Sequence, residues 1–504
     1  MADKKISQLT DINNDVDLDA DFIPIVDSSA TCTKKVKPQN LFSCEGVIAA
    51  CSSTAAGNCA VVVGGNNNTA SGNCSIVGGG CSNTASGSRS TVGGGQGNTA
   101  SGTNSFIGNG VNNVASGTRS VVVGGGGYYG NTASGANSFV GGGTNNRACG
   151  FNSAVLGGAN NAASGNCSAV LGGANNAASG NSSTIVGGFQ NRVNGFCSIV
   201  GGGAYNCANG DSSTVGGGYF NTACGFSLSV GGGNGNTACG FSSSVGGGGY
   251  NTASCTSSTI AGGSNNTASG SRSTVGGGKG NKSCCNASTV AGGCCNTASG
   301  NCSTVGGGHC NVASGAESTV AGGGYNNCAT ATSSTVGGGN GNRATGANST
   351  IAGGSINTAS CSGSTIAGGA NNAASGNTST IGGGFFNCTS NSYSTVGGGY
   401  FNRATGANST IAGGFVNVAA GAASAVVGGQ QNSACGNCSA ILGGISNLVC
   451  STHQKAFIVG SNITSVASCT LHANCLFLGN IPTSDAGLVA GQVYRDGTTL
   501  KIKT

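Results

Sequence analysis

The sequence predicts an all-β protein, a parallel β-solenoid or β-roll of about 25 coils. Three observations support this fold class. β-Branched residues recur at a step of 15, as in Val77, Val92 and Ile107. Glycine makes up 101 of 504 residues and proline only 3, without the Gly-X-Y triplets of collagen. Charged residues are 6% of the chain, far below the ~25% of an average protein.

The repeating unit is S-T-V-G-G-G-x-x-N-T-A-S-G-x-x, whose positions we number 1 to 15. Positions 1–4 and 9–12 alternate in character and are flanked by glycine-rich turns, which predicts two short strands per unit. Alternation places positions 1, 3, 9 and 11 on one face and positions 2, 10 and 12 on the other. Glycine costs about 1 kcal/mol at each interior helical position, so a helix is disfavoured.

Stacked coils would lie ~4.8 Å apart and pair with their neighbours on both sides. Each coil offers a core of essentially one valine and one alanine, which is thin against an ordering cost of roughly 1–2 kcal/mol per residue. We therefore expect the chain to bury further surface against other copies of itself.

Three segments follow from the pattern: residues 1–46, the repeats at 47–450, and residues 451–504. The start, MADKKISQLTDINND, has no apolar segment typical of a Sec signal peptide, and no apolar run is long enough to span a membrane. We expect synthesis in a cytoplasm and no membrane insertion. The repeats hold nine Lys and Arg but only two acids, Asp211 and Glu317. Such sparse charge argues against nucleic acid as a partner.

The runs GNTASGTNSFIGNG (97–110) and NNAASGNTSTIGGG (371–384) resemble the head repeats of trimeric autotransporter adhesins. This resemblance implies a left-handed parallel β-roll and a homotrimer. The chain departs from that family because it shows no signal peptide, coiled-coil stalk or outer-membrane anchor.

The two ends resemble other proteins. Residues 5–42 look like the N-terminal segment of phage and virus tail-fibre proteins, and residues 481–502 look like a C-terminal β-hairpin motif of phage structural proteins. The resemblance implies a fibre on the virion surface, attached to a virion or baseplate protein through residues 1–46. Residues 451–504 would then cap the solenoid and trimerise it.

Catalytic groups are scarce in the repeats, which hold two carboxylates and one histidine, His309. Asp211 and Glu317 are about seven coils apart, so they cannot act as a pair. We expect no enzyme activity and no cofactor.

Aromatic residues collect at the turn positions 7 and 8. They have two interpretations: packing between coils or chains, or a host-surface edge that binds a receptor or a glycan. The binding candidates are Tyr205, Tyr219, Phe220, Tyr250, Tyr325, Phe385, Phe386, Tyr400 and Phe401. Position 14 holds Phe151, Phe196, Phe226 and Phe241, and position 10 holds Arg147, Arg192, Arg343 and Arg403. Solvation is the simple interpretation of the arginines, and attraction to anionic glycans is the alternative.

The 27 cysteines mostly occupy slots that hold small residues in other coils. Free thiols are the simple interpretation, and disulfides between stacked coils are the second, with Cys224–Cys239 and Cys295–Cys310 as candidates. Cys294, Cys295, His309 and Cys310 form a weak candidate for zinc. Because Cys255, Cys285 and Cys361 replace the usual glycine at position 13, a left-handed backbone cannot be required there.

Two other functions remain open. The chain could be an extracellular or cell-surface adhesin, or a self-assembling filament exported without a Sec signal. It could also be an ice-binding solenoid, with hydroxyl ranks at positions 10 and 12.

Overall fold

The computed structural model describes residues 23–25, 34–36, 47–48, 52–475, 479–496 and 498–504. Every regular element in these ranges is a β-strand, and the strands form a parallel β-solenoid of about 28 turns with a repeat of about 15 residues. The predicted fold class is therefore confirmed. The chain divides into two compact units, Met1–Cys295 and Asn296–Thr504, which we describe separately.

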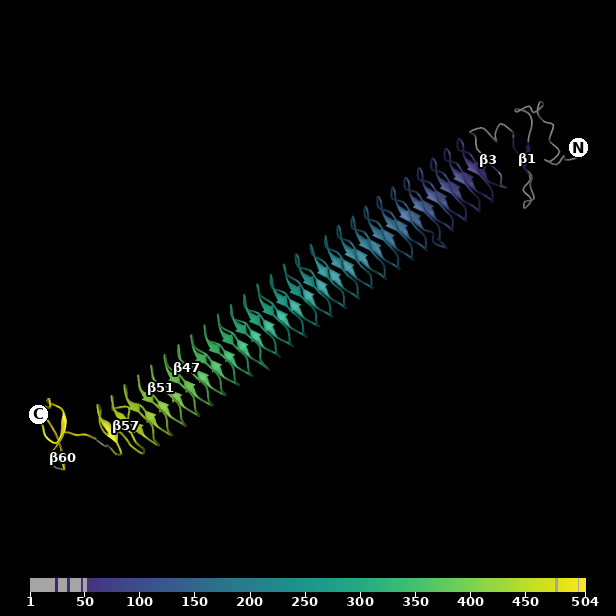
Figure 1. The fold of residues 1–504 in the computed structure, drawn as a ribbon. Coiled ribbons are helices and arrows are strands. Elements are labelled where there is room, and N and C mark those ends of the chain that lie inside the picture. The colour runs from purple at the N-terminus through teal and green to yellow at the C-terminus, as the bar shows by residue number, and fades with distance from the viewer. Residues whose placement is uncertain (1–22, 26–33, 37–46, 49–51, 476–478, 497) are drawn as a thin grey trace. The chain divides into compact units, whose positions relative to one another are not determined.

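Each coil contributes two strands of two residues. In one coil these are β9 (Thr91–Val92), at positions 2 and 3, and β10 (Thr99–Ala100), at positions 10 and 11. β9 pairs in parallel with β11 (Phe106–Ile107) of the next coil, and β10 pairs with β12 (Val114–Ala115). Within each unit, the odd-numbered strands thus form a valine sheet and the even-numbered strands form an alanine sheet, up to β57 and β56 in the second unit. Figure 1 shows this stacking, for example near β47 (Thr380–Ile381) and β51 (Thr410–Ile411).

The interior of each coil is formed by positions 1, 3, 9 and 11, as the alternation predicts. In the coil that contains β9 and β10, the side chains of Ser90, Val92, Asn98 and Ala100 are all fully buried. Isoleucine takes the place of valine in several coils and provides the largest buried side chains. The core is therefore one apolar residue from each sheet, flanked by two polar columns.

The asparagines at position 9 form a continuous hydrogen-bonded column within each unit. Asn98 Nδ2 donates to the carbonyl oxygens of Gly94 (2.9 Å) and Gly110 (2.8 Å). Asn98 Oδ1 accepts from the backbone N–H of Asn113 in the next coil (2.9 Å). Both donor hydrogens and the acceptor of the Asn98 amide are thus satisfied, so the buried side chain joins its own turn to the coil that follows.

Glycine occupies positions 6 and 13 for different physical reasons. Gly95 at position 6 has a φ of +89°, and a Cβ there would lie 2.0 Å from the Gly110 oxygen. Gly102 at position 13 faces the same 2.0 Å approach, to the Gly117 oxygen, but its φ is not positive. Position 13 therefore favours glycine for close coil packing and not for a left-handed backbone, and the cysteines found there show that some coils accommodate a Cβ.

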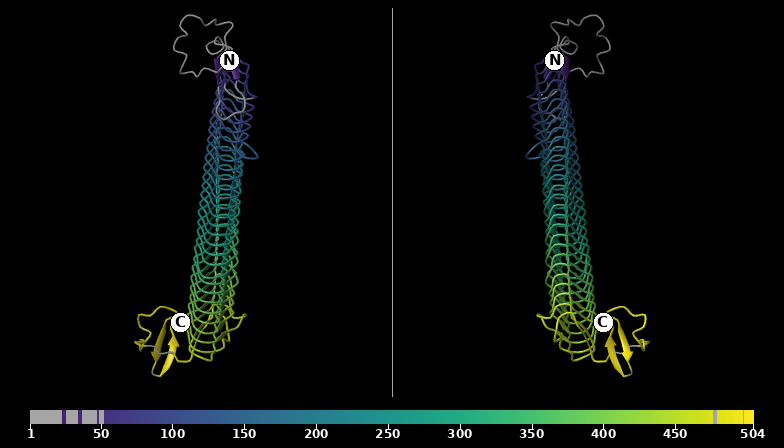
Figure 2. Two further views of the ribbon diagram at one scale, coloured as in Figure 1. Left: turned by 90° about the vertical axis from the view of Figure 1, so that its right-hand side faces the viewer. Right: turned by 90° about the vertical axis from the view of Figure 1, so that its left-hand side faces the viewer.

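Two coils between Ser53 and Ile441 are longer than 15 residues, and both insertions lie in the turn before position 9. Val122 pairs with Val140 although 18 residues separate them, and Val320 pairs with Val336. In the first case the additional residues form a loop around Tyr128 and Tyr129, whose exposed fractions are 88% and 64%. This loop protrudes from the stack in Figure 2. The strand ladders keep their register on both sides of each insertion.

The stacking extends beyond residue 450, the predicted end of the repeats. β57 (Phe457–Val459) pairs with β55 (Ala440–Ile441), and β58 (Leu471–Ala473) pairs with β57. After these coils, β59 (Val493–Asp496) and β60 (Thr499–Ile502) form an antiparallel hairpin. Lys503 lies 2.8 Å from Asp485 and joins the hairpin to the preceding loop.

Within the predicted attachment segment 1–46, the structure describes only β1 (Ile23–Ile25) and β2 (Lys34–Val36), which pair antiparallel. The rest of that segment lies outside the described residues. The solenoid begins with β3 (Val47–Ile48), which pairs in parallel with β5 (Val61–Val62).

Candidate binding edge and the adjoining sheet face

Positions 7 and 8 form one edge of each solenoid unit, which we call the binding edge. Residues at position 7 bridge in parallel from coil to coil, as Ala204 does to Tyr219. The backbone N–H of a residue at position 8 donates to the position 7 oxygen of the preceding coil, as from Phe220 to Ala204 (3.1 Å). Side chains at these positions are therefore held in two regular columns by backbone bonds.

The first unit gathers four aromatic rings on this edge. Tyr205 contacts Phe189 edge-on at 5.6 Å between ring centroids and stacks on Phe220 at 4.7 Å. Tyr219 packs edge-on against both Tyr205 and Phe220. Tyr219 and Phe220 are exposed by 45% and 51%, whereas Tyr205 is less exposed because rings of the neighbouring coils cover it.

The second unit carries a larger group of five rings. Phe386 stacks on Phe401 at 4.8 Å, and Tyr400 stacks on both Phe385 and Phe415. All five rings are exposed, with fractions from 37% to 43%. The rings thus pack between coils and still present one face to solvent, so the two interpretations of these residues are compatible within the single chain.

The other aromatic candidates do not join these two groups. The ring of Tyr250 lies over Gly235, and Tyr325 stacks on His309 at 5.0 Å. Position 14 lies on a different turn, where Phe226 stacks on Phe241 at 5.3 Å. Sequence reasoning missed Phe189 and Phe415, although both occupy position 7 of the same column.

The backbone at position 8 is left-handed from Asn67 to Ser446 in every coil except that of Gly130, which carries the longer insertion. Asparagine tolerates this conformation and is found there in Asn112, Asn145, Asn160, Asn175, Asn265 and Asn371. Phe220, Phe386 and Phe401 adopt it with φ of 55–56°, and the β-branched Ile356 and Val416 do so as well. Such bulky residues cost about 1–2 kcal/mol in this conformation, so folding alone does not explain them.

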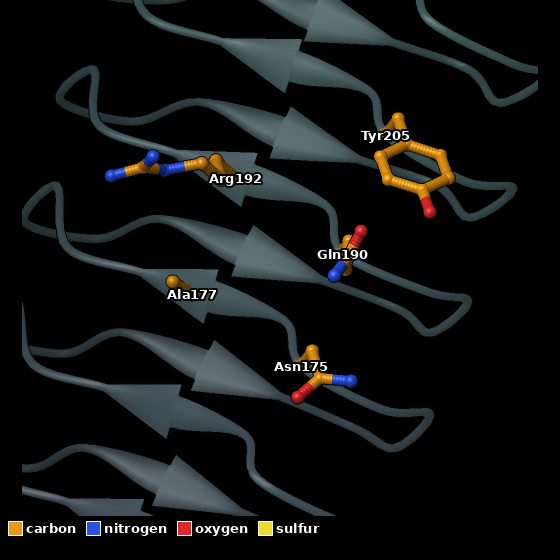
Figure 3. A pocket seen from close by; sticks show the side chains of 5 residues that line it. All are labelled: Asn175, Ala177, Gln190, Arg192 and Tyr205. Atoms are coloured by element: carbon orange, nitrogen blue, oxygen red, sulfur yellow. The ribbon is translucent and has the colours of Figure 1, made fainter.

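The outer face of the alanine sheet adjoins the binding edge and carries the arginines of position 10. Arg147, Arg192, Arg343 and Arg403 are all exposed. A depression of about 430 Å³ lies beside Arg192 and is lined by Asn175, Ala177, Gln190, Arg192 and Tyr205 (Figure 3).

Cysteines share the position 10 column with these arginines. Cys207 pairs in register with Arg192, Cys328 with Arg343, and Cys388 with Arg403. Burial raises the pKa of the Cys207 thiol, although the Arg192 guanidinium and a hydrogen bond to Asn209 act in the opposite direction. Burial likewise raises the pKa of Cys388 against the effect of Arg403. Since the thiolate is the reactive form, these two thiols are poor nucleophiles at neutral pH.

One pair of stacked cysteines is bonded. Cys224 and Cys239 occupy position 12 of adjacent coils, with Cα atoms 4.7 Å apart, and form a disulfide. Cys295 closes the first unit and Cys310 lies in the second, as does His309. Across the part of the chain that the structure describes, no group of three or more His, Cys, Asp or Glu side chains is arranged to hold a metal ion.

Comparison with known proteins gives no family assignment, because no family model matches the chain and no curated protein does. Among the described residues, no helix has the length and apolar character needed to cross a membrane. The chemistry that the site offers comes from its own side chains: aromatic faces, amides and guanidinium groups on a regular scaffold.

Proposed function

We propose that this chain is a non-enzymatic structural fibre of a virus or phage particle, and that its binding edge attaches to a host surface. Attachment to the particle through residues 1–46 rests on the resemblance of the two ends to phage and virus proteins. Binding by the edge rests on the aromatic groups around Phe220 and Phe401.

The observation that carries the proposal is the placement of bulky aromatic rings at a left-handed, exposed position. Phe220 is 51% exposed at a φ of 55°, a backbone conformation for which several other coils of the column use asparagine. A residue that is unfavourable for the backbone and only partly buried contributes little to folding. Exposed aromatic anchors on a rigid scaffold are typical of binding surfaces.

The test replaces the rings with residues that other coils carry at the same position. The variant combines Tyr219→Ala, Phe220→Asn, Tyr400→Ala and Phe401→Asn. Binding of the labelled full-length protein to a panel of bacterial and eukaryotic cells, measured by flow cytometry, should fall about tenfold or more. Thermal stability should not decrease, since the left-handed strain is relieved.

The matched control is Phe226→Asn with Phe241→Asn, which removes two stacked rings from the position 14 turn. This variant should bind cells as the unmodified protein does. Equal binding by the four-residue variant and the unmodified protein would overturn the role of the binding edge.

We further propose a homotrimer, as the resemblance to trimeric adhesin heads implies. Support comes from an apolar stripe on the outer face of the valine sheet, at positions 2 and 4 of the first unit. Its members are exposed by 37–57% and are Val63, Ile76, Phe106, Val123, Phe139, Leu156, Leu171, Val186 and Ile199. An exposed stripe of this kind is typical of a surface that packs against another chain.

Light scattering tests this association directly. The solution mass should be three times the 47.5 kDa of the chain. Phe106→Thr, Phe139→Thr and Leu156→Gly restore the repeat consensus and should lower that mass towards one chain. A monomeric unmodified protein, or a trimer insensitive to these changes, would contradict the proposed interface.

Ice binding is the second candidate, favoured by one observation. The row of hydroxyl groups expected at position 10 is interrupted by arginine and cysteine. Position 2 of the second unit, however, holds threonine in every coil from Thr304 to Thr410. These threonines lie on the outer face of the valine sheet at regular coil spacing. Thermal hysteresis measured on the purified protein tests this candidate, and its absence would exclude it.

A further inference from the structure

The depression beside Arg192 lies where the position 10 column changes from threonine to smaller residues. Arg147, Ala162, Ala177 and Arg192 are consecutive in this column, and each pairs in register with the next. Two alanines therefore replace two threonines between two arginines. Their missing side-chain atoms leave a shallow floor on an otherwise regular sheet face.

One wall of the depression is formed by position 8. Asn175, Gln190 and Tyr205 follow one another along this column, and Figure 3 shows them on one side of the floor at Ala177. The ring of Tyr205 is fixed by Phe189 and Phe220, which contact it from the two neighbouring coils on either side. The wall thus combines amide donors and acceptors with one oriented aromatic ring.

The opposite side carries positive charge. In Figure 3, Arg192 extends over the sheet away from Tyr205, and Ala177 lies one coil from Arg192 in the same column. No ion pair to Arg192 is present among the described residues. The only carboxylate in the repeats of the first unit is Asp211, whose Oδ1 accepts from the backbone N–H of Phe196 at the position 14 turn. An anionic ligand would therefore meet an uncompensated charge.

We propose that this depression binds an acidic saccharide, a pyranose ring that carries a carboxylate. The ring would lie on the alanine floor against Tyr205, its hydroxyl groups would bond to Asn175 and Gln190, and its carboxylate would bond to Arg192. The proposal deepens the proposed function, because it names the class of surface ligand that the first unit would take.

The shape of the site agrees with a polymer ligand. The depression is open to solvent, whereas sites for small cofactors enclose most of their ligand. Arg147 lies three coils from Arg192, about 14 Å at the spacing of parallel strands, so a chain with regularly spaced carboxylates can reach both guanidinium groups. A single site of this kind binds weakly, and repeated copies in an oligomer would raise the avidity.

The decisive variant fills the depression while restoring the repeat consensus. Ala177→Thr introduces the residue that most coils hold at position 10, so the fold should tolerate it. Ala373→Thr is the matched control, because it makes the same change at the same position in the second unit, where the adjacent residues of the column are Thr358 and Cys388 and not an arginine. Arg192→Ala removes the charge, and Arg343→Ala is its control in the same column.

The probes are hexagalacturonate and its carboxyl-reduced, neutral form, with binding to the full-length protein followed by saturation-transfer NMR and calorimetry. The unmodified protein should bind hexagalacturonate, and should bind the neutral form about tenfold more weakly. Ala177→Thr and Arg192→Ala should each weaken binding about tenfold, and both control variants should leave it unchanged.

The inference fails if the unmodified protein does not bind hexagalacturonate, or if Ala177→Thr binds it as tightly as Ala373→Thr does. Cell binding of the same proteins separates this failure from failure of the proposed function. If cell binding depends on the aromatic residues of the binding edge but the protein does not bind hexagalacturonate, only the proposed acidic-saccharide ligand is rejected.

Discussion

The asparagine column at position 9 and the serine column at position 1 flank the same core, yet their buried polar groups differ in hydrogen bonding. Asn98 makes three hydrogen bonds through its amide. The hydroxyl of Ser90 is buried without a partner among the described residues, as are those of Ser75, Ser105, Ser120, Ser138, Ser183, Ser273, Ser349 and Ser424.

The sequence varies accordingly. Every coil from Asn68 to Asn447 has asparagine at position 9, whereas position 1 also accommodates Ala60, Leu228 and Ala456, all buried. Asparagine is required at position 9 for its hydrogen bonds, whereas position 1 tolerates buried side chains that make no hydrogen bond. Four changes test this difference, from the largest expected effect to the smallest.

Asn98→Ala should destabilise its coil by about 3–5 kcal/mol, because it leaves the Asn113 N–H and the Gly94 and Gly110 carbonyls without their side-chain partners in a buried turn. Amide hydrogen exchange of the flanking coils measures the free energy of local opening. Asn112→Ala, at the exposed position 8 of the next coil, is the control. A loss below about 1 kcal/mol for Asn98→Ala would contradict the structural role of the column.

Removal of the disulfide tests how much a covalent link between coils adds to the hydrogen bonds of the asparagine column. Cys224→Ser with Cys239→Ser opens a loop with a sequence separation of 15 residues. The chain-entropy model gives a loss of about 3 kcal/mol for a loop of this size. Exchange protection of the coils around residue 230 should fall in the double variant, whereas Cys149→Ser, at the same position without a disulfide, should not change it. Equal protection in the two variants would show that the asparagine column already holds these coils.

Alanine substitutions at the two glycine positions distinguish the energetic cost of a left-handed backbone from the cost of close packing between coils. Gly95→Ala places a side chain at a left-handed φ and against the Gly110 oxygen, which should cost about 2–4 kcal/mol. Gly102→Ala meets only the packing conflict, which the coil of Ala331 already accommodates at position 13, so it should cost about 1 kcal/mol. Chemical denaturation of both variants measures the difference. Equal losses would mean that the φ at position 6 carries no energetic penalty.

Ser90→Ala should change the stability by less than about 0.5 kcal/mol, since it removes a buried hydroxyl that has no partner. Ser153→Ala is the comparison, because Ser153 Oγ donates to the Gly150 carbonyl at 2.8 Å. That variant should lose about 1 kcal/mol. A loss of more than about 2 kcal/mol for Ser90→Ala would show that the serine hydroxyls contribute to the fold after all.

Much of this arrangement follows from the repeat itself. Alternation around Val92 and Ala100 predicts both strands, their buried faces and the parallel stacking, because the pattern is strictly periodic. The bonds of Asn98 are not predictable in this way, since they depend on how each turn meets the next coil. The stacking also continues through Phe457 and Leu471, where the 15-residue spacing is lost and the repeat pattern gives no signal.

The candidate site is less predictable for a related reason. The aromatic residues at positions 7 and 8 stand out in the sequence, but their grouping depends on which of them fall on consecutive coils. The depression arises from an absence of side-chain atoms at Ala177 next to Arg192 and Tyr205. Such a hollow requires two columns to be compared across three neighbouring coils, and no single motif marks it.

The loop around Tyr128 and Tyr129 has a broader consequence. Its additional residues leave the pairing of Ala115 with Ala133, and of Val122 with Val140, intact. Chain length at this turn is thus uncoupled from the register of the stack. Evolution can vary the turn by insertion while the ladders continue, and a protein engineer can use the same turn to display a foreign peptide at a chosen height along the solenoid.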